Sequence, residues 1–164
     1  MTLSIRPPLE RDLDQLRTLA RTIWQATYPA LIPQAQIDFM LADRYGVALI
    51  RAQLDDLGHA WRLAWWTDEM VGFAHARIEG EVCKLDKFYI HPNYQRRGIG
   101  RALLDDIKAF ARVHAATRLS LQVNRGNTAA IAAYEQYGFI TCEARVFDIG
   151  GGFVMDDYVM EAPL

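Results

Sequence analysis

The chain lacks the features that mark several large classes of protein. It contains only 2 cysteines, Cys83 and Cys142, without a Cys-x-x-Cys motif, so a disulfide scaffold is disfavoured and two reduced core thiols are expected. No apolar run approaches the roughly 18 residues that a membrane-spanning helix needs. Charged side chains within residues 1–12 interrupt any signal-peptide core. These absences predict a soluble, cytoplasmic protein that does not associate with membranes.

The chain also lacks a surplus of positive charge. Lys and Arg number 18 against 20 Asp and Glu, which gives a formal net charge of -2. A general nucleic-acid binder carries a basic excess, so nucleic acid is not an expected partner and any anion site must be local. The length of 164 residues and the 51% hydrophobic content predict a single domain over residues 1–164 with one core.

Hydrophobic periodicity predicts a mixed α/β fold. Strands are expected over residues 2–6, 60–67, 69–78, 81–90, 118–123, 139–149 and 153–160. Helices are expected from Leu9 to Trp24 and over residues 34–41, 47–57, 99–114 and 128–137. The three successive strands between residues 60 and 90 are expected to be antiparallel, and the glycines at 150–152 are expected to turn the last two strands into a hairpin. One mixed sheet can contain every strand.

The most informative segment joins the strand that ends at Ile90 to the next helix. The loop and the start of the helix read Gln95, Arg96, Arg97, Gly98, Ile99, Gly100 and Arg101. A glycine-containing turn from strand to helix leaves backbone N–H groups free at the positive end of the helix, which suits a phosphate or pyrophosphate. A plain strand-to-helix turn is the alternative, and a lone Gly-x-Gly would favour it.

Other phosphate loops fit these residues less well. A Walker A loop requires Lys and then Ser or Thr after its second glycine, but Arg101 and Ala102 follow Gly100. A dinucleotide fingerprint requires a third Gly or Ala where Leu103 stands. An ATPase, a GTPase and a Rossmann-type dehydrogenase are therefore disfavoured.

Three segments have to be considered together: the loop at residues 95–100, the strand end at residues 88–92 (Phe-Tyr-Ile-His-Pro), and the segment of residues 124–139. In this order they resemble the GNAT (Gcn5-related) family of N-acetyltransferases, namely its Gln/Arg-x-x-Gly-x-Gly/Ala pyrophosphate loop, the end of its splayed fourth strand, and the segment after its fifth strand. The resemblance implies a single-domain α/β fold. Its sheet is expected to be mixed, mostly antiparallel and twisted, with about seven strands, flanking helices and a splay between the fourth and fifth strands.

The resemblance also implies acetyl-CoA as the co-substrate, an amine as the acceptor and no metal. The backbone N–H groups of Gln95, Arg96, Arg97, Gly98, Ile99, Gly100 and Arg101 would hold the pyrophosphate. The backbones of Phe88, Tyr89 and Ile90 would pair with the pantetheine arm, and the uneven apolar spacing from Val82 to Ile90 independently indicates a β-bulge. Asn127 matches a pantetheine-contacting residue, and a helix N-cap is an equally compatible role.

Direct attack of a primary amine on a thioester needs an acid and a base. Tyr134 matches the family's general acid: a phenol with a pKa near 10 can donate a proton or a hydrogen bond to a thiolate whose thiol pKa is roughly 8.5. A core aromatic is the alternative for Tyr134. The acceptor amine, with a pKa around 10.4, must first lose a proton, for which Asp86 is the best candidate and a water relay is the alternative.

Several questions stay open at this level. The acceptor is a primary amine of a small molecule or a peptide, and the chain forms either a monomer or a homodimer. A CoA-binding module without catalysis and a nucleotide-binding regulator are the competing functions. The adjacent acids at 55–56, 105–106 and 156–157 are predicted to face solvent, and the four histidines have no metal-ligand spacing.

Overall fold

The computed structural model describes residues 2–164, whose strands form one seven-stranded sheet in the order β1-β2-β3-β4-β5-β7-β6. The strands are β1 (Leu3–Arg6), β2 (His59–Trp66), β3 (Glu69–Glu79), β4 (Val82–Ile90), β5 (Arg118–Asn124), β6 (Ile140–Gly150) and β7 (Phe153–Pro163). The helices are α1 (Leu13–Thr27), α2 (Gln34–Arg44), α3 (Val47–Leu54), α4 (Ile99–Val113) and α5 (Thr128–Gln136), with short 3-10 turns η1 (Glu10–Asp12) and η2 (Pro92–Tyr94). Every pairing is antiparallel except that of β4 with β5, which confirms the predicted mixed sheet.

Local sequence explains where several elements begin and end. The turn between β6 and β7 holds Gly150, Gly151 and Gly152 at φ of 90, 63 and 80°, a left-handed conformation that favours glycine. The side-chain oxygen of Asn127 accepts a hydrogen bond from the Ala130 N–H at 3.3 Å, which confirms its predicted N-cap role for α5. Helix α3 ends at Leu54, three residues before the predicted end at residue 57. The chain turns after the helix because the Asp56 Oδ1 accepts a hydrogen bond from the Gly58 N–H at 2.8 Å.

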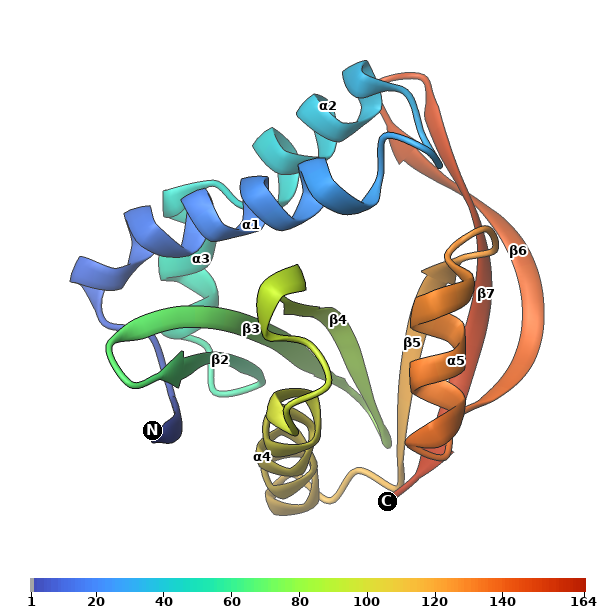
Figure 1. Ribbon diagram of the computed structural model, residues 1–164. Coiled ribbons are helices and arrows are strands. Elements are labelled where there is room, and N and C mark those ends of the chain that lie inside the picture. The colour runs from blue at the N-terminus through green and yellow to red at the C-terminus, as the bar shows by residue number, and fades with distance from the viewer. Residues whose placement is uncertain (1) are drawn as a thin grey trace.

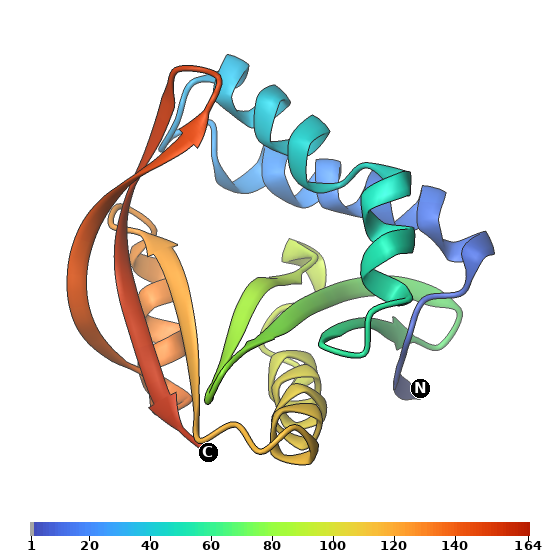
Figure 2. The same cartoon turned by 180° about the vertical axis from the view of Figure 1, so that it is seen from behind.

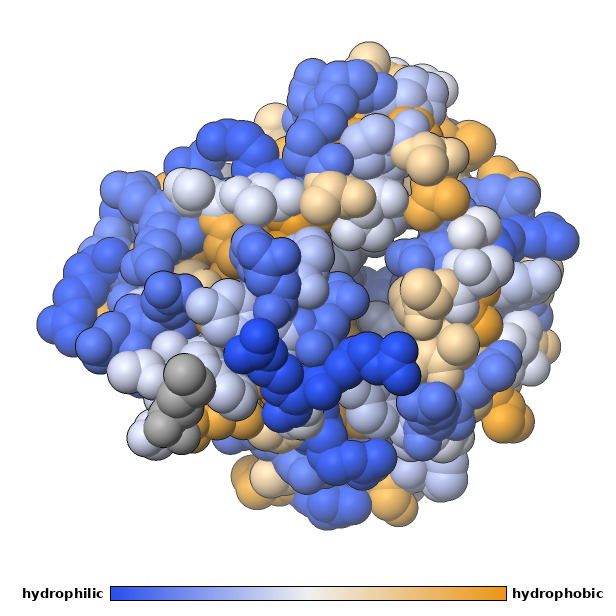
Figure 3. Space-filling model, viewed as in Figure 1, coloured by the Kyte–Doolittle hydropathy of each residue, from blue (hydrophilic) through white to orange (hydrophobic). Residues whose placement is uncertain are grey.

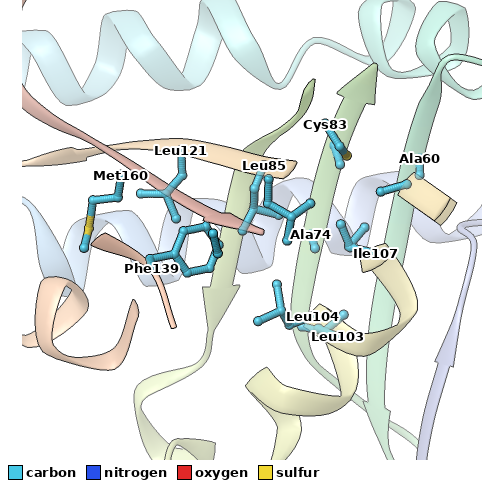
Figure 4. Packing of buried hydrophobic residues seen from close by; sticks show 14 of the residues in the cluster. Ala60, Ala74, Cys83, Leu85, Leu103, Leu104, Ile107, Leu121, Phe139 and Met160 are labelled. Atoms are coloured by element: carbon cyan, nitrogen blue, oxygen red, sulfur yellow. The ribbon is translucent and has the colours of Figure 1, made fainter. Parts of the chain in front are cut away.

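Helices cover both faces of the sheet. On one face, α4 packs its apolar side against β2, β3 and β4, and Figure 4 shows Leu103, Leu104 and Ile107 beside Ala74 and Leu85. On the other face, α1, α2 and α3 cover a second core that includes aromatic side chains of β2 and β3. Figure 1 and Figure 2 show α5 on the half of the molecule formed by β5, β7 and β6.

The sheet is split where β4 leaves β5. The two strands pair only through Val82–Lys84 and Arg118–Ser120, and beyond these residues they diverge into a V (Figure 1). On the other side of β4, His75 pairs with Lys87 and Ala76 pairs with Leu85, so Asp86 is an extra residue in the ladder. The predicted splay and the predicted bulge are both confirmed.

Two predictions about burial were wrong. Cys142 is exposed because β6 is the last strand of the sheet and the side chains on most of its length face solvent, whereas Cys83 is buried as expected. Asp157 is buried, not solvated, because β7 lies between β5 and β6 and turns this residue inward. Within residues 2–164, every helix is too short or too polar to traverse a bilayer.

Candidate active site

A cleft of about 970 Å³ occupies the V between β4 and β5. Its walls come from α1, α2, β4, β5, α5, β7 and the loop before α4. Figure 3 shows the hollow near the centre of this face, with strongly hydrophilic residues along its lower border. A space of this size accommodates a ligand of several hundred daltons, and it is the larger of the two pockets described here.

The loop before α4 presents backbone donors at one end of the cleft. Gly98 and Arg96 have φ of 81 and 62°, and Gly98 caps the helix without a side-chain hydrogen bond. The first intrahelical bond runs from Ala102 N–H to the Gly98 carbonyl at 3.1 Å, so the preceding N–H groups of the helix have no partner within it. Gln95, Arg96, Gly98, Ile99 and Gly100 line the cleft.

The two remaining residues of the predicted loop site stand beside the cleft. The Arg97 guanidinium lies 5.0 Å from the Tyr94 ring centroid, and that of Arg101 lies 5.4 Å from the Tyr137 ring centroid. The Tyr137 hydroxyl in turn occupies the space that a Cβ on Gly100 would need. Any residue with a Cβ at position 100 would therefore clash with Tyr137. Because glycine has no Cβ, neighbouring groups can come close to the backbone of Gly100.

The free edge of β4 forms one wall of the cleft. Phe88, Tyr89 and Ile90 line it, and they pair with β3 on their other side only. In a sheet strand, alternate N–H and C=O groups point to opposite neighbours, so part of this backbone faces the cleft without a strand partner. Asn127 also lines the cleft, while its side-chain oxygen caps α5.

Tyr134 projects from α5 into the cleft. Its ring packs against Phe88 and Phe139, with centroid separations of 6.0 and 5.7 Å. Burial raises the pKa of Tyr134 well above its usual range, so the phenol stays neutral and keeps its proton at neutral pH. Nearby, the hydroxyls of Tyr28 and Tyr89 lie 3.0 Å apart, and burial raises the pKa of both phenols.

Asp86 lines the cleft but already has three cationic or donor neighbours. Its carboxylate lies 2.8 Å from Lys87 Nζ, 3.3 Å from His75 Nδ1 and 3.3 Å from Arg77 Nη1. Burial alone would raise the pKa of Asp86, but the hydrogen bonds from His75 and Lys87 outweigh burial and hold that pKa well below its usual range. The carboxylate is therefore held in its charged form and has little affinity for a proton.

Sequence reasoning missed two groups that border the cleft or underlie it. One is the chain from His59 through His75 to Asp86, in which His59 Nδ1 and His75 Nε2 lie 2.9 Å apart. The registers of the β2–β3 and β3–β4 hairpins together could have indicated it. The other is Asp157, which is 4% exposed and shares the inward face of β7 with Met155. The period-two alternation of that strand is the signal that could have found it.

Comparison with known proteins gives one consistent result. The model of the acetyltransferase (GNAT) family matches residues 13–139. The chain is 25% identical to spermidine N(1)-acetyltransferase of Thermoplasma acidophilum over 98% of this chain and 97% of the relative. It is 37% identical to the [ribosomal protein bS18]-alanine N-acetyltransferase of Escherichia coli K12, over 43% of this chain and 48% of the relative. The structure of PaiA N-acetyltransferase from Thermoplasma acidophilum in complex with coenzyme A has a TM-score of 0.82 at 24% identity and covers 100% of both chains.

Proposed function

This chain belongs to the acetyltransferase (GNAT) family and is an acetyl-CoA-dependent N-acetyltransferase, and we propose which of its groups perform the transfer. The loop before α4 binds the pyrophosphate, the free edge of β4 binds the pantetheine arm, and Tyr134 assists the departing thiolate. The observation that supports this assignment is that all three elements border one cleft. The arrangement leaves the wide part of the V for the acceptor.

Binding of the carrier follows from the backbone geometry. The N–H groups of residues 95–101 lie at the positive end of the α4 dipole, where two phosphate charges are stabilised. The pantetheine arm contains amide groups, so it can add to β4 as an extra strand and hydrogen-bond to the backbones of Phe88, Tyr89 and Ile90. Asn127 contributes from the start of α5. The acetyl group is then held between β4 and Tyr134.

The transfer itself is a direct attack without a covalent enzyme intermediate. A backbone N–H of β4 near Phe88–Ile90 stabilises the charge that develops on the thioester oxygen. The neutral phenol of Tyr134 donates to the sulfur as the C–S bond breaks. Asp86 stays a predicted base. Its contacts with His75, Arg77 and Lys87 favour a second, structural role, in which it joins β3 and β4 beneath the cleft.

The acceptor is proposed to be a primary amine of a small molecule or a peptide. The names of the relatives support this class, because one is a spermidine acetyltransferase and another acetylates an alanine of a ribosomal protein. We further propose that the enzyme works in the cytoplasm as a monomer or homodimer, which cell fractionation and light scattering can test. A nucleic-acid partner is not expected, since the formal net charge is -2.

The decisive experiment measures thiol release from acetyl-CoA in the presence of a panel of amines. Tyr134→Phe is expected to lower kcat by roughly 100-fold or more while CoA affinity stays unchanged, because only the donated proton is removed. Tyr158→Phe, on β7 outside the cleft, is the matched control and keeps full turnover. Wild-type protein that is thermally stabilised by ATP or NAD but not by CoA would refute the proposal.

A further inference from the structure

Asp157 is a buried carboxylate that the transfer step above does not use. It is 4% exposed, and its Oδ1 has no hydrogen-bond partner within residues 2–164. Buried polar atoms in folded proteins are almost always paired, because an unpaired one loses its hydration without compensation. An unpaired carboxylate oxygen at the wall of an active-site cleft therefore indicates a donor that arrives with a ligand.

The position of Asp157 places it with the reacting groups. It pairs with Asn124 at the end of β5, and it lines the cleft together with Tyr28 and Tyr134. Tyr28 follows α1, Tyr134 lies on α5 and Asp157 lies on β7, so three separate elements bring these side chains to the wall of one cleft. An acceptor that enters the V meets this carboxylate on the wall opposite β4.

The charges around Asp157 come from four elements. Arg44 of α2 and Lys84 of β4 are the neighbouring cations, Tyr28 lies at the end of α1, and Asp156 is adjacent on β7. None of them is bonded to the carboxylate: Lys84 Nζ donates to Gln122 Oε1 at 3.3 Å, and Asp156 is paired with Arg125. Burial raises the pKa of Asp157 to about 6 against the opposing effect of Arg44. The group is thus mostly charged at neutral pH and is also able to take up a proton.

We propose that Asp157 binds the ammonium group of the acceptor and accepts the proton that this group must lose before it attacks. The assignment rests on the proposed transfer function and names its acceptor site. A carboxylate with an open oxygen is the group that a protonated alkyl amine fits best, since each N–H can donate to it. Asp86 is less suited to this task because its oxygens already accept from Lys87, His75 and Arg77.

The proton balance of the step is complete. Asp157 takes one proton from R–NH3⁺, and the free amine forms a C–N bond with the thioester carbonyl carbon. The C–S bond then breaks and its electron pair stays on sulfur. The sulfur receives a proton through Tyr134, and the phenol is restored by the second N–H proton of the former amine. The proton on Asp157 finally leaves to water, so the products are the amide, CoA–SH and H⁺.

The test compares Asp157→Asn with Asp156→Asn, its exposed neighbour. Asp157→Asn is expected to lower kcat/KM for the amine by roughly 100-fold or more and to leave CoA affinity within about twofold. Asp156→Asn is expected to retain wild-type kinetics. Asp157→Glu keeps a carboxylate and is expected to recover part of the activity. In the wild type, kcat/KM is expected to decline below about pH 6, and the residual activity of Asp157→Asn is expected to lack this decline.

Thermal melting separates an acceptor site from a structural role. A buried charge without a partner destabilises the fold, so Asp157→Asn is expected to melt at a higher temperature than the wild type at pH 8. A variant that melts lower would show that Asp157 supports the structure and would overturn the proposal. The proposal would also be overturned if the wild type is active and Asp157→Asn retains a kcat/KM within threefold of the wild-type value. Failure of the transfer function itself is recognisable separately, as wild-type protein that releases no thiol with any amine.

Discussion

The carboxylate of Asp86 lies 2.8 Å from the Nζ of Lys87, the next residue along the chain. A regular strand places consecutive side chains on opposite faces, and the bulge at Asp86 brings these two together. Lys87 is 5% exposed, and the ring centroids of Tyr45 and Trp61 each lie 5.2 Å from its Nζ. The cleft floor therefore contains a buried ion pair that holds β4 in its bulged form.

Removal of the Asp86 charge is expected to destabilise the protein. Asp86→Asn leaves Lys87 buried with weaker partners, which costs about 3 kcal/mol of the free energy of unfolding. Urea denaturation measures the change. Glu79→Gln is the control, because Glu79 pairs with Arg77 near the surface and its loss is expected to cost less than about 1 kcal/mol.

A double variant separates this structural role from the predicted role of Asp86 as a base. Replacement of both partners, as in Asp86→Asn with Lys87→Met, is expected to recover most of the lost stability because no buried charge remains. If the double variant regains turnover together with stability, the role of Asp86 is structural. Turnover that stays low in a stable double variant would assign it to the reaction.

The turn at Gly98 predicts a selective loss of cofactor binding. Gly98 and Gly152 have φ of 81 and 80°, and a Cβ on either would meet no atom within 4 Å. Alanine at each position is therefore expected to cost a similar amount, about 1 kcal/mol, through backbone strain alone. Only Gly98→Ala is expected to weaken CoA, by roughly tenfold in Kd measured by calorimetry, because only its turn orients the α4 donors. Equal CoA affinity in the two variants would contradict the loop assignment.

Two buried groups are expected to give opposite slopes of stability against pH. Burial lowers the pKa of His75 to about 4, so the unfolded chain takes up a proton first and stability falls as pH drops from 6.5 to 4. Burial raises the pKa of Asp157 from 3.8 to about 6, so the folded chain takes up a proton first and stability rises as pH drops from 6 to 4. The two effects largely cancel in the wild type.

Single variants are expected to reveal each slope. Asp157→Asn is expected to lose roughly 3 kcal/mol between pH 6.5 and 4, and His75→Gln is expected to gain a similar amount, at 1.36 kcal/mol per pKa unit. Denaturant midpoints at intervals of half a pH unit provide the measurement. His114→Gln, near the end of α4, is the control and is expected to retain the wild-type profile. If the wild type and all three variants showed parallel curves of stability against pH, His75 and Asp157 would not be the groups that cause the two slopes.

The cations around the acceptor site are expected to discriminate between amines. Arg44 and Lys84 line the cleft and both act on the charge of Asp157, whereas Asp86 is already neutralised by its own partners. Arg44→Gln is therefore expected to raise kcat/KM for an acceptor with several ammonium groups by roughly tenfold relative to a monoamine at low salt, and by less at high salt. Arg21→Gln, an exposed position of α1 outside the cleft, has the same change in charge and is expected to show no such preference.

The fold could be predicted from the sequence because its signals are local. Alternating apolar residues or runs rich in β-branched and aromatic residues indicated most of the strands, and the glycines at 98 and 150–152 marked turns in which they adopt a positive φ. The broken spacing from Val82 to Ile90 indicated the bulge, since a one-residue insertion shifts every later side chain to the other face. These features depend on neighbours within a few residues.

The missed features depend on contacts between distant segments. The period-two alternation of β7 puts Asp156 and Asp157 on opposite faces, and the placement of β7 between β5 and β6 decides that Asp157 is the buried one. Cys142 is apolar in character yet exposed, because the order of the last two strands puts β6 at the edge. The contact of His59 with His75 spans 16 positions and depends on the register of β2 with β3.

Because β4 pairs with β5 over only a short stretch, hydrogen exchange of the β4 amides can report whether a ligand is bound along this strand. Beyond Lys84, the β4 amides that point away from β3 have no strand neighbour, so deuterium can reach them in the free protein. Binding of the pantetheine arm along this edge, as proposed above, is expected to protect the same amides, and release of CoA is expected to expose them again. The stretch of β4 beyond Lys84 is thus expected to gain and lose backbone hydrogen bonds in every catalytic cycle.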